Sequence, residues 1–378
     1  MKKLYPIGIQ NFEKLRIGGY SYVDKTKFVY QLANTGSYYF MSRPRRFGKS
    51  LLISTLEAYF EGKKELFEGL AIEKLEREWT KYPVLHLDLN SKKFDSTADL
   101  IRLIDRQLLI YEVEYGSSDA DHSIDDRLFT LIRLVYEKTG QRVVILVDEY
   151  DKPMLQAIGN EALQKECRDT LKAYYGVMKS MDKCIRLAFL TGVTKFGKVS
   201  AFSDLNNLDD ISMDDRYIEI CGITEQEIHT NYEDELHQLA QSQSMTYEEV
   251  SKELKERYDG YHFSENTIGM YNPFSLLSTF AKMKFGSYWF ETGTPSYLVE
   301  LLKLHHYDLY RMAHEETSAD VLNSIDSSST NPIPVIYQSG YLTIKGYDPR
   351  FRIYRLGITN KEMEEGLIEL LKMGQHTD

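Results

Sequence analysis

The segment Arg43–Ser50, which reads RPRRFGKS, constrains the fold of this 378-residue chain more than any other stretch. A short apolar run, Tyr38–Met41, precedes it, and an amphipathic run begins at Leu51. This succession predicts a strand, a loop and a helix, with a Gly-Lys-Ser triplet at the start of the helix. In a phosphate-binding loop of this kind, backbone N–H groups surround the phosphates, the lysine reaches the outer ones and the serine hydroxyl holds Mg²⁺.

The first half of this loop departs from the usual pattern, because Arg43 stands in place of the leading glycine. Glycine there permits a backbone conformation that other residues adopt only at a cost, so we expect a turn of another shape. The amides closest to the phosphates do not depend on that position. Arg45 and Arg46 either contact the phosphates as fixed cations or face solvent or an acidic neighbour. The predicted nucleotide-binding residues are Arg45, Arg46, Phe47, Gly48, Lys49, Ser50 and Leu51.

A second motif lies about a hundred residues further on, where the apolar run Val143–Val147 leads directly into Asp148 and Glu149. A continuously apolar strand is typical of the buried centre of a parallel sheet. Two carboxylates at its end form a Walker B arrangement, in which Asp148 holds Mg²⁺ directly or through water and Glu149 polarises the attacking water. Taken alone, the pair is explained as well by acids that merely solvate the end of a strand. The phosphate loop upstream favours the nucleotide site.

One predicted strand, Val84–Leu89, lies in sequence between the two motifs. This spacing fits the group of phosphate-loop NTPases in which an extra strand separates the two motif strands in the sheet. That group often places a polar residue at the tip of the next strand. Thr191 stands there and would bond the attacking water or the γ-phosphate, unless it merely forms a strand-end turn with Gly192. The predicted catalytic residues are Glu149, Lys49 and Thr191; the predicted metal ligands are Ser50 and Asp148; the predicted cofactors are ATP and Mg.

Alternating strand and helix patterns over the first 220 residues predict an α/β fold with a parallel sheet flanked by helices. The predicted strands are Tyr38–Ser42, Val84–Leu89, Val143–Asp148, Ile185–Thr191 and Tyr217–Ile220. The predicted helices between them are Leu51–Phe60, Leu100–Tyr111, Arg127–Lys138 and Glu161–Met181.

Helical patterns dominate after Gly222, where a capping box at Thr224 opens the first helix. The predicted helices are Glu225–Gln241, Tyr247–Tyr258, Pro273–Phe285, Ser296–Leu304, Ala313–Ile325 and Lys361–Met373, with a hairpin of Tyr341–Ile344 and Arg352–Arg355. We therefore predict an NTPase domain over 1–222, a mainly helical lid or partner domain over 223–360, and the start of a truncated or missing C-terminal domain over 361–378.

The net charge of −11 argues against a broad nucleic-acid surface, although a local basic groove around the phosphate loop stays open. No apolar run approaches the length of a membrane span, and the N-terminus lacks the apolar core of a secretory signal. The three cysteines fit reduced thiols. We expect a cytoplasmic protein that binds ATP without membrane attachment, with a protein partner or homo-oligomer left open.

Together these motifs resemble the bacterial AAA-ATPase-like family of uncharacterised proteins, over about residues 5–365. Besides RPRRFGKS, the shared segments are Tyr22–Thr26, Val147–Asp151, Thr191–Phe196, Tyr258–Tyr261, Tyr271–Ser275 and Ser339–Thr343. The resemblance implies an ATP site, and in that family arginine is usual at the position of Arg43. Members often continue into a nuclease-like domain of the PD-(D/E)xK type. This chain stops at Asp378, soon after Gly357–Glu362, which resembles the junction before that domain, so we expect no nuclease activity.

The expected function is a Mg-dependent, ATP-hydrolysing module that couples nucleotide state to the helical domain. A non-catalytic nucleotide-dependent switch or scaffold and the ATPase part of a DNA-processing system are the alternatives. For Asp24 a helix cap is favoured over a contact to base or ribose. Asp151 and Lys152 either touch the site or are solvated loop charges.

Overall fold

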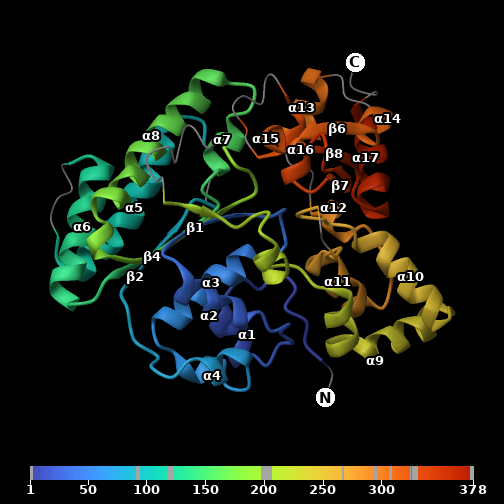
Figure 1. Ribbon diagram of the computed structural model, residues 1–378, viewed down its shortest axis with the longest axis horizontal. Coiled ribbons are helices and arrows are strands. Elements are labelled where there is room, and N and C mark those ends of the chain that lie inside the picture. The colour runs from blue at the N-terminus through green and yellow to red at the C-terminus, as the bar shows by residue number, and fades with distance from the viewer. Residues whose placement is uncertain are drawn as a thin grey trace.

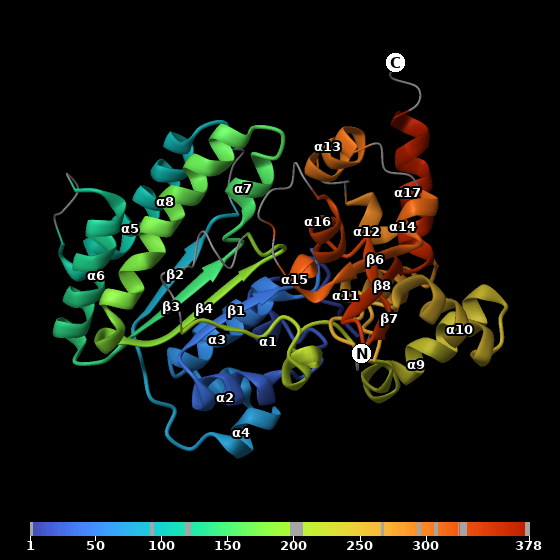
Figure 2. The same cartoon turned by 45° about the horizontal axis from the view of Figure 1, so that its top comes forward.

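The computed structural model describes residues 3–90, 94–117, 122–196, 207–265, 268–292, 296–305, 309–323, 325 and 331–374. A sheet flanked by helices forms one part of the molecule, and a second part, built from later residues, lies beside the carboxyl ends of the strands (Figures 1 and 2). The phosphate loop and the acids that follow the third strand lie at this junction.

The main sheet contains five strands in the order β2-β3-β4-β1-β5, and every pair is parallel. The strands are β1 (Tyr38–Ser42), β2 (Val84–Asp88), β3 (Val143–Asp148), β4 (Ile185–Gly192) and β5 (Asp209–Asp210). Since β4 pairs with both β1 and β3, one strand separates the two motif strands, as the sequence predicted. Parallel pairing brings the carboxyl ends of these strands to one edge of the sheet.

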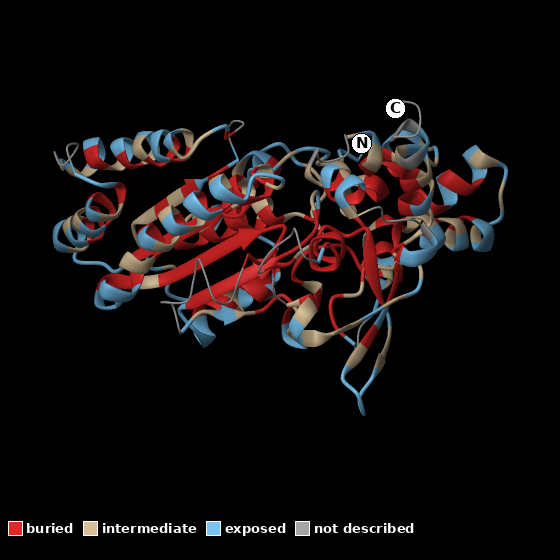
Figure 3. Ribbon diagram, turned by 90° about the horizontal axis from the view of Figure 1, so that it is seen from above, coloured by how far each residue is buried: buried red, intermediate tan, exposed pale blue. Residues whose placement is uncertain are grey.

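Helices cover both faces of the sheet (Figure 1). One face carries α5 (Thr97–Tyr115), α6 (Ile124–Thr139) and α8 (Glu161–Ser180), and the other carries α1 (Phe12–Ile17), α2 (Thr26–Thr35), α3 (Lys49–Phe60) and α4 (Ala71–Leu75). Along β3, Val143, Ile145 and Val147 pack in the core under α5, α6 and α8, whereas Val144 and Leu146 pack in the core under α1 to α4. The central strands β1, β3 and β4 are therefore buried on both faces, as Figure 3 shows, which explains the continuous apolarity of β3. Short elements complete this part: η1 (Lys64–Phe67), α7 (Lys152–Gln156) and η2 (Asp182–Cys184).

The second part combines helices with a small antiparallel sheet of order β6-β8-β7. Its helices are α9 (Glu225–Gln243), α10 (Tyr247–Tyr258), α11 (Pro273–Lys282), α12 (Tyr288–Glu291), α13 (Ser296–His305), α14 (Leu309–Met312), α15 (Ala319–Leu322), α16 (Ile333–Gln338) and α17 (Lys361–Gly374). The 3₁₀ helix η4 (Asp215–Ile220) lies between the two parts in sequence, and its Tyr217 and Ile220 are buried in the core of the first part. Its strands are β6 (Glu315–Ser318), β7 (Leu342–Asp348) and β8 (Ile353–Ile358). Met363 and Leu367 of α17 are buried in the same core as Leu342 and Leu356 of the small sheet.

Two predicted elements are wrong. Tyr217–Ile220 is not the fifth strand but part of η4, because the Asp214 carboxylate caps this turn by accepting the N–H of Arg216. The fifth strand is the two-residue β5 instead.

The predicted helix Ala313–Ile325 is divided between strand β6 and the short helix α15. The Ser318 hydroxyl accepts the N–H of Val321 and so starts the helix late, while residues 315–318 pair with β8. The predicted hairpin is present as β7 and β8, longer than expected and widened by β6 to three strands. Among the described residues, no helix has both the length and the apolar character needed to cross a membrane.

Candidate nucleotide site

The phosphate loop ends at Gly48, which is the N-cap of α3 and has a left-handed backbone with φ 94° and ψ 15°. A Cβ placed on Gly48 would meet no atom within 4 Å, so glycine is favoured here by the backbone angle and not by crowding. The first N–H groups of a helix have no partners within it, and the helix dipole adds positive charge there. The start of α3 is consequently suited to bind an anion.

Lys49 is 4% exposed although it carries a charge. Its Nζ donates to the carbonyl oxygen of Pro44 at 3.2 Å and lies 3.8 Å from Oε1 of Glu149. The ammonium group is therefore held between the phosphate loop and the acid that follows β3.

Asp148 and Glu149 have different surroundings, although they are adjacent. Asp148 is buried, and its Oδ1 accepts the Thr191 hydroxyl at 2.7 Å and the N–H of Glu149 at 3.0 Å. Glu149 has a positive φ of 55°, an unfavourable angle for a residue with a side chain. Burial raises the pKa of Glu149, nearby Lys49 opposes this and Asp148 adds to it. A carboxylate whose pKa is raised in this way is suited to act as a general base.

A cavity of about 520 Å³ opens over the phosphate loop. Its volume lies within the range of about 300–1,000 Å³ that is common for small-molecule sites. The predicted residues that line it are Arg45, Arg46, Gly48, Lys49, Ser50, Leu51 and Glu149, joined by Asn90, Lys152, Phe274 and Tyr297 from other segments. The structure thus brings together seven of the predicted residues at one cavity.

Three other predicted residues do not line this cavity. Asp148 and Thr191 are buried, and the Thr191 hydroxyl is engaged with the carboxylate of Asp148. The Phe47 side chain packs edge-on against Tyr261, with ring centroids 4.7 Å apart. Thr191 therefore supports the Asp148 carboxylate, and Phe47 supports the phosphate loop through Tyr261, although neither residue lines the cavity.

A smaller and more apolar pocket of about 90 Å³ adjoins the cavity. The two share Pro6, Gly48, Leu51, Pro273 and Leu277, and the smaller one is otherwise lined by residues that include Tyr22, Val23, Cys221, Gly222 and Ile223. Together they form a polar chamber with an apolar extension.

Arg43 explains the departure of this loop from the usual sequence. Its guanidinium group is 1% exposed and donates to the carbonyl oxygens of Ser42 at 2.9 Å and Ser212 at 2.7 Å. It also lies over the Phe263 ring, 4.0 Å from the ring centroid. Burial lowers the pKa of Arg43 to about 10. This side chain fastens the loop to later segments of the chain.

The next two loop residues are also covered by the second part of the molecule. Gly340 packs so closely on Pro44 that a Cβ at Gly340 would lie 2.9 Å from the proline ring. The carbonyl oxygen of Arg45 accepts the indole N–H of Trp289 at 2.9 Å. Sequence reasoning did not find either contact, because the partners lie far away along the chain.

The last two residues before Gly48 complete the series. The Arg46 guanidinium lies over the Phe274 ring at 4.9 Å from its centroid, and Phe47 packs on Tyr261 as described. Each residue from position 43 to 47 therefore contacts the second part of the molecule. This arrangement accounts for the arginines and the phenylalanine of a loop that normally relies on glycine.

Asp151 has a role that sequence reasoning left open. Its carboxylate is fully buried and accepts the N–H groups of Val193 at 3.1 Å and Thr194 at 2.6 Å, in the loop after β4. Burial raises the pKa of Asp151 to about 7, and the charge of Glu149 acts in the same direction. The acid is therefore structural support for the loop behind the site and not a solvated loop charge.

The loop after β4 also joins the second part of the molecule. The backbone N–H of Lys195 donates to Oε1 of Gln338 at 2.7 Å, and its Nζ donates to Oδ1 of Asn323 at 3.1 Å. For Lys152 the sequence also left open whether the side chain touches the site. It lines the cavity and donates to the side chain of Asn90.

Asp24 has the structural role that was favoured from the sequence. One of its carboxylate oxygens accepts the N–H of Thr26 at 2.8 Å, and the other accepts the N–H of Ala71 at 2.7 Å. Lys25 is the N-cap residue of α2, and the Asp24 side chain, one residue before it, bonds the first N–H of the helix and ties α2 to α4.

Comparison with known proteins agrees with this geometry. Residues 6–202 match the model of a family described as Predicted AAA-ATPase. The chain is 40% identical over 379 aligned positions to a protein of Azotobacter chroococcum mcd 1 described as an uncharacterized protein in the vnfD 5′ region, and the alignment covers 98% of this chain and 70% of that relative. This chain therefore belongs to the AAA-ATPase-like family, and at a coarse level it is a nucleotide-binding module of the ATPase type.

Proposed function

We propose that the protein binds ATP in the cavity over the phosphate loop and hydrolyses it with the help of Mg²⁺. The observation that carries this proposal is the convergence of Lys49 and Glu149, 3.8 Å apart, at the start of α3 within one cavity. A cation that binds phosphate and a carboxylate that orients water are two of the groups that this hydrolysis requires from the protein.

The triphosphate would lie along the start of α3. The N–H groups of that helix and the ammonium group of Lys49 would stabilise its charge, and Arg45 and Arg46 line the same cavity. The adjoining pocket suits the base, because its lining is mainly apolar and includes Tyr22, Val23 and Leu277.

The residues present fit a magnesium ion. Ser50 lines the cavity and Asp148 ends the other motif strand, β3, and hydroxyl and carboxylate oxygens are ligands that Mg²⁺ prefers. The bound ion would neutralise charge on the phosphate oxygens. Thr191 would keep the Asp148 carboxylate in one orientation through its hydrogen bond.

Glu149 would orient the attacking water and accept its proton. In the structure this carboxylate lies beside Lys49, so we infer that phosphates drawing the ammonium group toward them free Glu149 for that task. The raised pKa of Glu149 supports the assignment.

Two substitutions test the proposal. Glu149→Gln should retain ATP binding but release phosphate at least a hundredfold more slowly, whereas Lys49→Ala should lose binding. Binding is measured by thermal unfolding with and without Mg·ATP, since a ligand at about a hundred times its Kd stabilises a protein by about 2.7 kcal/mol. Turnover is measured as phosphate release.

The outcomes separate the candidate functions. The absence of any thermal shift with nucleotides would remove the proposal. Equal turnover by Glu149→Gln and the parent protein would remove the role of Glu149. Binding without turnover would instead assign a nucleotide-dependent switch, and turnover that requires DNA would assign a DNA-processing role.

A further inference from the structure

The indole of Trp289 connects the second part of the molecule to the phosphate loop. Its N–H donates to the carbonyl oxygen of Arg45 at 2.9 Å, and the side chain is 4% exposed. The ring packs against Tyr341 with centroids 5.2 Å apart, so its direction is fixed by packing. Because an indole nitrogen only donates, this bond fixes the direction of the Arg45 carbonyl group.

The neighbouring carbonyl of the loop is held from the other side. The carbonyl oxygen of Pro44 accepts a hydrogen bond from the ammonium group of Lys49, as described above. The successive carbonyls of Pro44 and Arg45 are therefore bonded by donors from the two different parts of the molecule. One of these donors, Lys49, is proposed to turn to the phosphates when nucleotide binds. A change at Pro44 would therefore be transmitted to the peptide unit whose carbonyl Trp289 holds.

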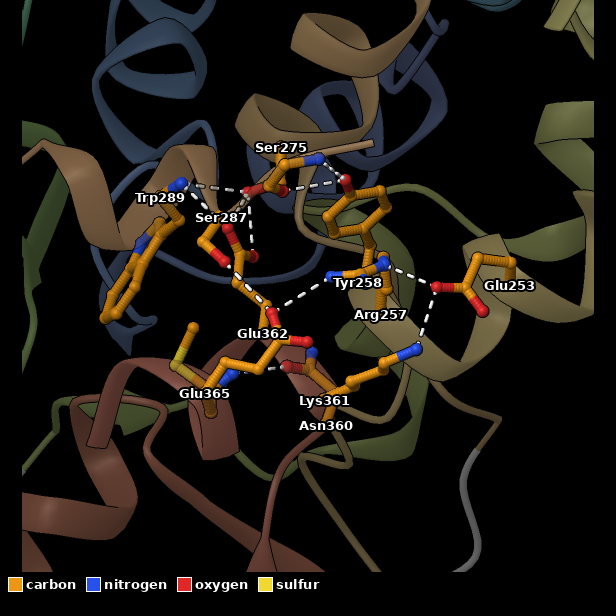
Figure 4. A network of polar contacts seen from close by, with 12 residues as sticks. Glu253, Arg257, Tyr258, Ser275, Ser287, Trp289, Asn360, Lys361, Glu362 and Glu365 are labelled. Carbon is orange, nitrogen blue, oxygen red and sulfur yellow. Dashed lines mark hydrogen bonds and ion pairs between the residues drawn. The ribbon is translucent and has the colours of Figure 1, made fainter. Parts of the chain in front are cut away.

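The backbone of Trp289 is in turn held by Glu362 of α17. Oε1 of Glu362 accepts the N–H of Trp289 at 2.9 Å, and the Ser275 hydroxyl lies 2.9 Å from both carboxylate oxygens (Figure 4). Helices α11, α12 and α17 thus meet on one carboxylate that is fully buried. Its position decides where α12, and with it the indole, stands relative to the loop.

The charged groups around Glu362 have partners of their own. Arg257 of α10 bonds Glu365 at 3.0 Å, and Lys361 bonds Glu253 at 2.9 Å (Figure 4). Within the described ranges, no ammonium or guanidinium group lies within ion-pair distance of Glu362. A carboxyl group buried without a cation is costly in either protonation state unless it is hydrogen-bonded, and an apolar contact would join three helices more cheaply. Its presence indicates that the direction of its hydrogen bonds matters.

We propose that Trp289 is a positioning residue for the phosphate loop, and that Glu362 acts through it. In this arrangement α17 senses and supports the nucleotide site without touching nucleotide. The inference rests on the proposed ATP binding, and it goes further by naming the path from the loop to α17.

Fluorescence provides a direct test, because the chain has two tryptophans. Trp79 packs against Phe67 in the first part of the molecule, so Trp79→Phe leaves Trp289 as the single indole reporter. In this variant, Mg·ATP should change the emission of Trp289 with the same Kd that thermal unfolding reports. Adding Lys49→Ala should abolish both signals. ATP binding in the thermal assay with unchanged emission would overturn the inference alone, whereas no binding in either assay would remove the proposed function as well.

A double-mutant cycle tests the path. Trp289→Phe keeps the ring but removes the donor to Arg45, and it should weaken Mg·ATP binding by about three- to tenfold, the effect of one net hydrogen bond. Glu362→Ala should weaken binding to a similar extent. If the two residues act in series, the double variant should bind no more weakly than the weaker single variant. Additive losses would overturn the series arrangement.

Two conservative variants separate positioning from general destabilisation. Glu362→Gln keeps an oxygen acceptor for Trp289 and should restore binding to within about twofold of the parent protein. Glu365→Gln, one turn away on α17, alters the bonds to Arg257 and Ser287 but not to Trp289, so binding should be unchanged. A loss in Glu365→Gln equal to that in Glu362→Ala would show that any disturbance of α17 suffices, and the positioning role would fail.

Discussion

Arg43 illustrates how a single residue can change the way in which the conformation of a phosphate loop is stabilised. A glycine at this position normally allows a tight turn, whereas here a buried guanidinium group bonds the carbonyl oxygens of Ser42 and Ser212 and lies over Phe263. The loop is shaped by these tertiary contacts, so it does not need the conformational freedom of glycine.

Replacing this arginine with the usual residue should therefore harm the protein. We expect Arg43→Gly to lower the free energy of unfolding by about 3 kcal/mol or more, because buried carbonyl groups lose their donor. Arg46→Gly is the matched control in the same loop. Arg46 is exposed and has a φ of 64°, so glycine there should be neutral or slightly stabilising in the absence of nucleotide.

Urea denaturation without nucleotide measures both variants. An Arg43→Gly protein as stable as the parent would show that the guanidinium contacts are dispensable and that the loop keeps its shape for another reason.

The site residues that could be predicted from the sequence share one property: each belongs to a short pattern of neighbouring residues. Gly48, Lys49 and Glu149 could be predicted, because a glycine and a lysine before a helix and an acid after an apolar strand form short patterns. Trp289 and Glu362 could not, because their importance depends on contacts to segments 244 and 73 residues away. Asp151 lay within a recognised segment, yet its partners 42 and 43 residues later decide its role.

The same division applies at the scale of helices and strands. The core strands and the capping box of α9 were predicted because apolar runs and caps determine them locally. The strand β6 was missed because pairing with β8 overrides the helical pattern of residues 313–325, and β5 is too short to leave a pattern at all. The division into domains near residue 222 stays a prediction.

The start of α9 also joins the two parts of the molecule. Glu227 completes the capping box with Thr224, and its carboxylate binds the buried ammonium group of Lys25 at 2.6 and 2.7 Å. Helix α10 has an equivalent box at Thr246 and Glu249, which is exposed and has no such bridge among the described residues. The two helices therefore offer a matched pair.

We expect Glu227→Gln to cost about 2 kcal/mol or more of unfolding free energy, since the cap is kept but Lys25 loses its counter-charge in a buried position. Glu249→Gln should change stability by no more than about 0.5 kcal/mol. Chemical denaturation compares them. Equal effects in the two helices would mean that the bridge to Lys25 adds nothing beyond the cap.

For the whole molecule, the buried carboxyl group of Glu362 predicts a dependence of stability on pH. Burial raises its pKa from 4.5 to about 7; the hydrogen bonds of Trp289 and Ser275 and the charge of Arg257 oppose this, and the charge of Glu365 adds to it. Tyr258 of α10 faces the same group. The folded state therefore holds this proton at pH values where the unfolded state has lost it.

The direction of the pH dependence follows from the difference in proton binding between the folded and unfolded states. The contribution of this group to stability is fully present below about pH 4.5 and is lost as the pH rises through 7, by up to about 1.4 kcal/mol per pH unit. Glu362→Gln should remove this slope. Asp151 acts in the same direction, so the quantity to measure is the difference in unfolding free energy between parent and variant from pH 5 to 8. Parallel curves would contradict the prediction.

The covering of the phosphate loop by later residues has a consequence for biosynthesis. Trp289 leaves the ribosome 244 residues after Arg45, which at roughly 5–20 residues per second means a delay of about 12–50 s. During that interval the sheet and its helices can form, whereas the partners of positions 43–47 emerge one after another, from Ser212 to Trp289, and Gly340 follows still later. A nascent chain should thus form the core of its sheet early and become able to bind nucleotide late. The order of translation would then prevent nucleotide binding before the chain is complete.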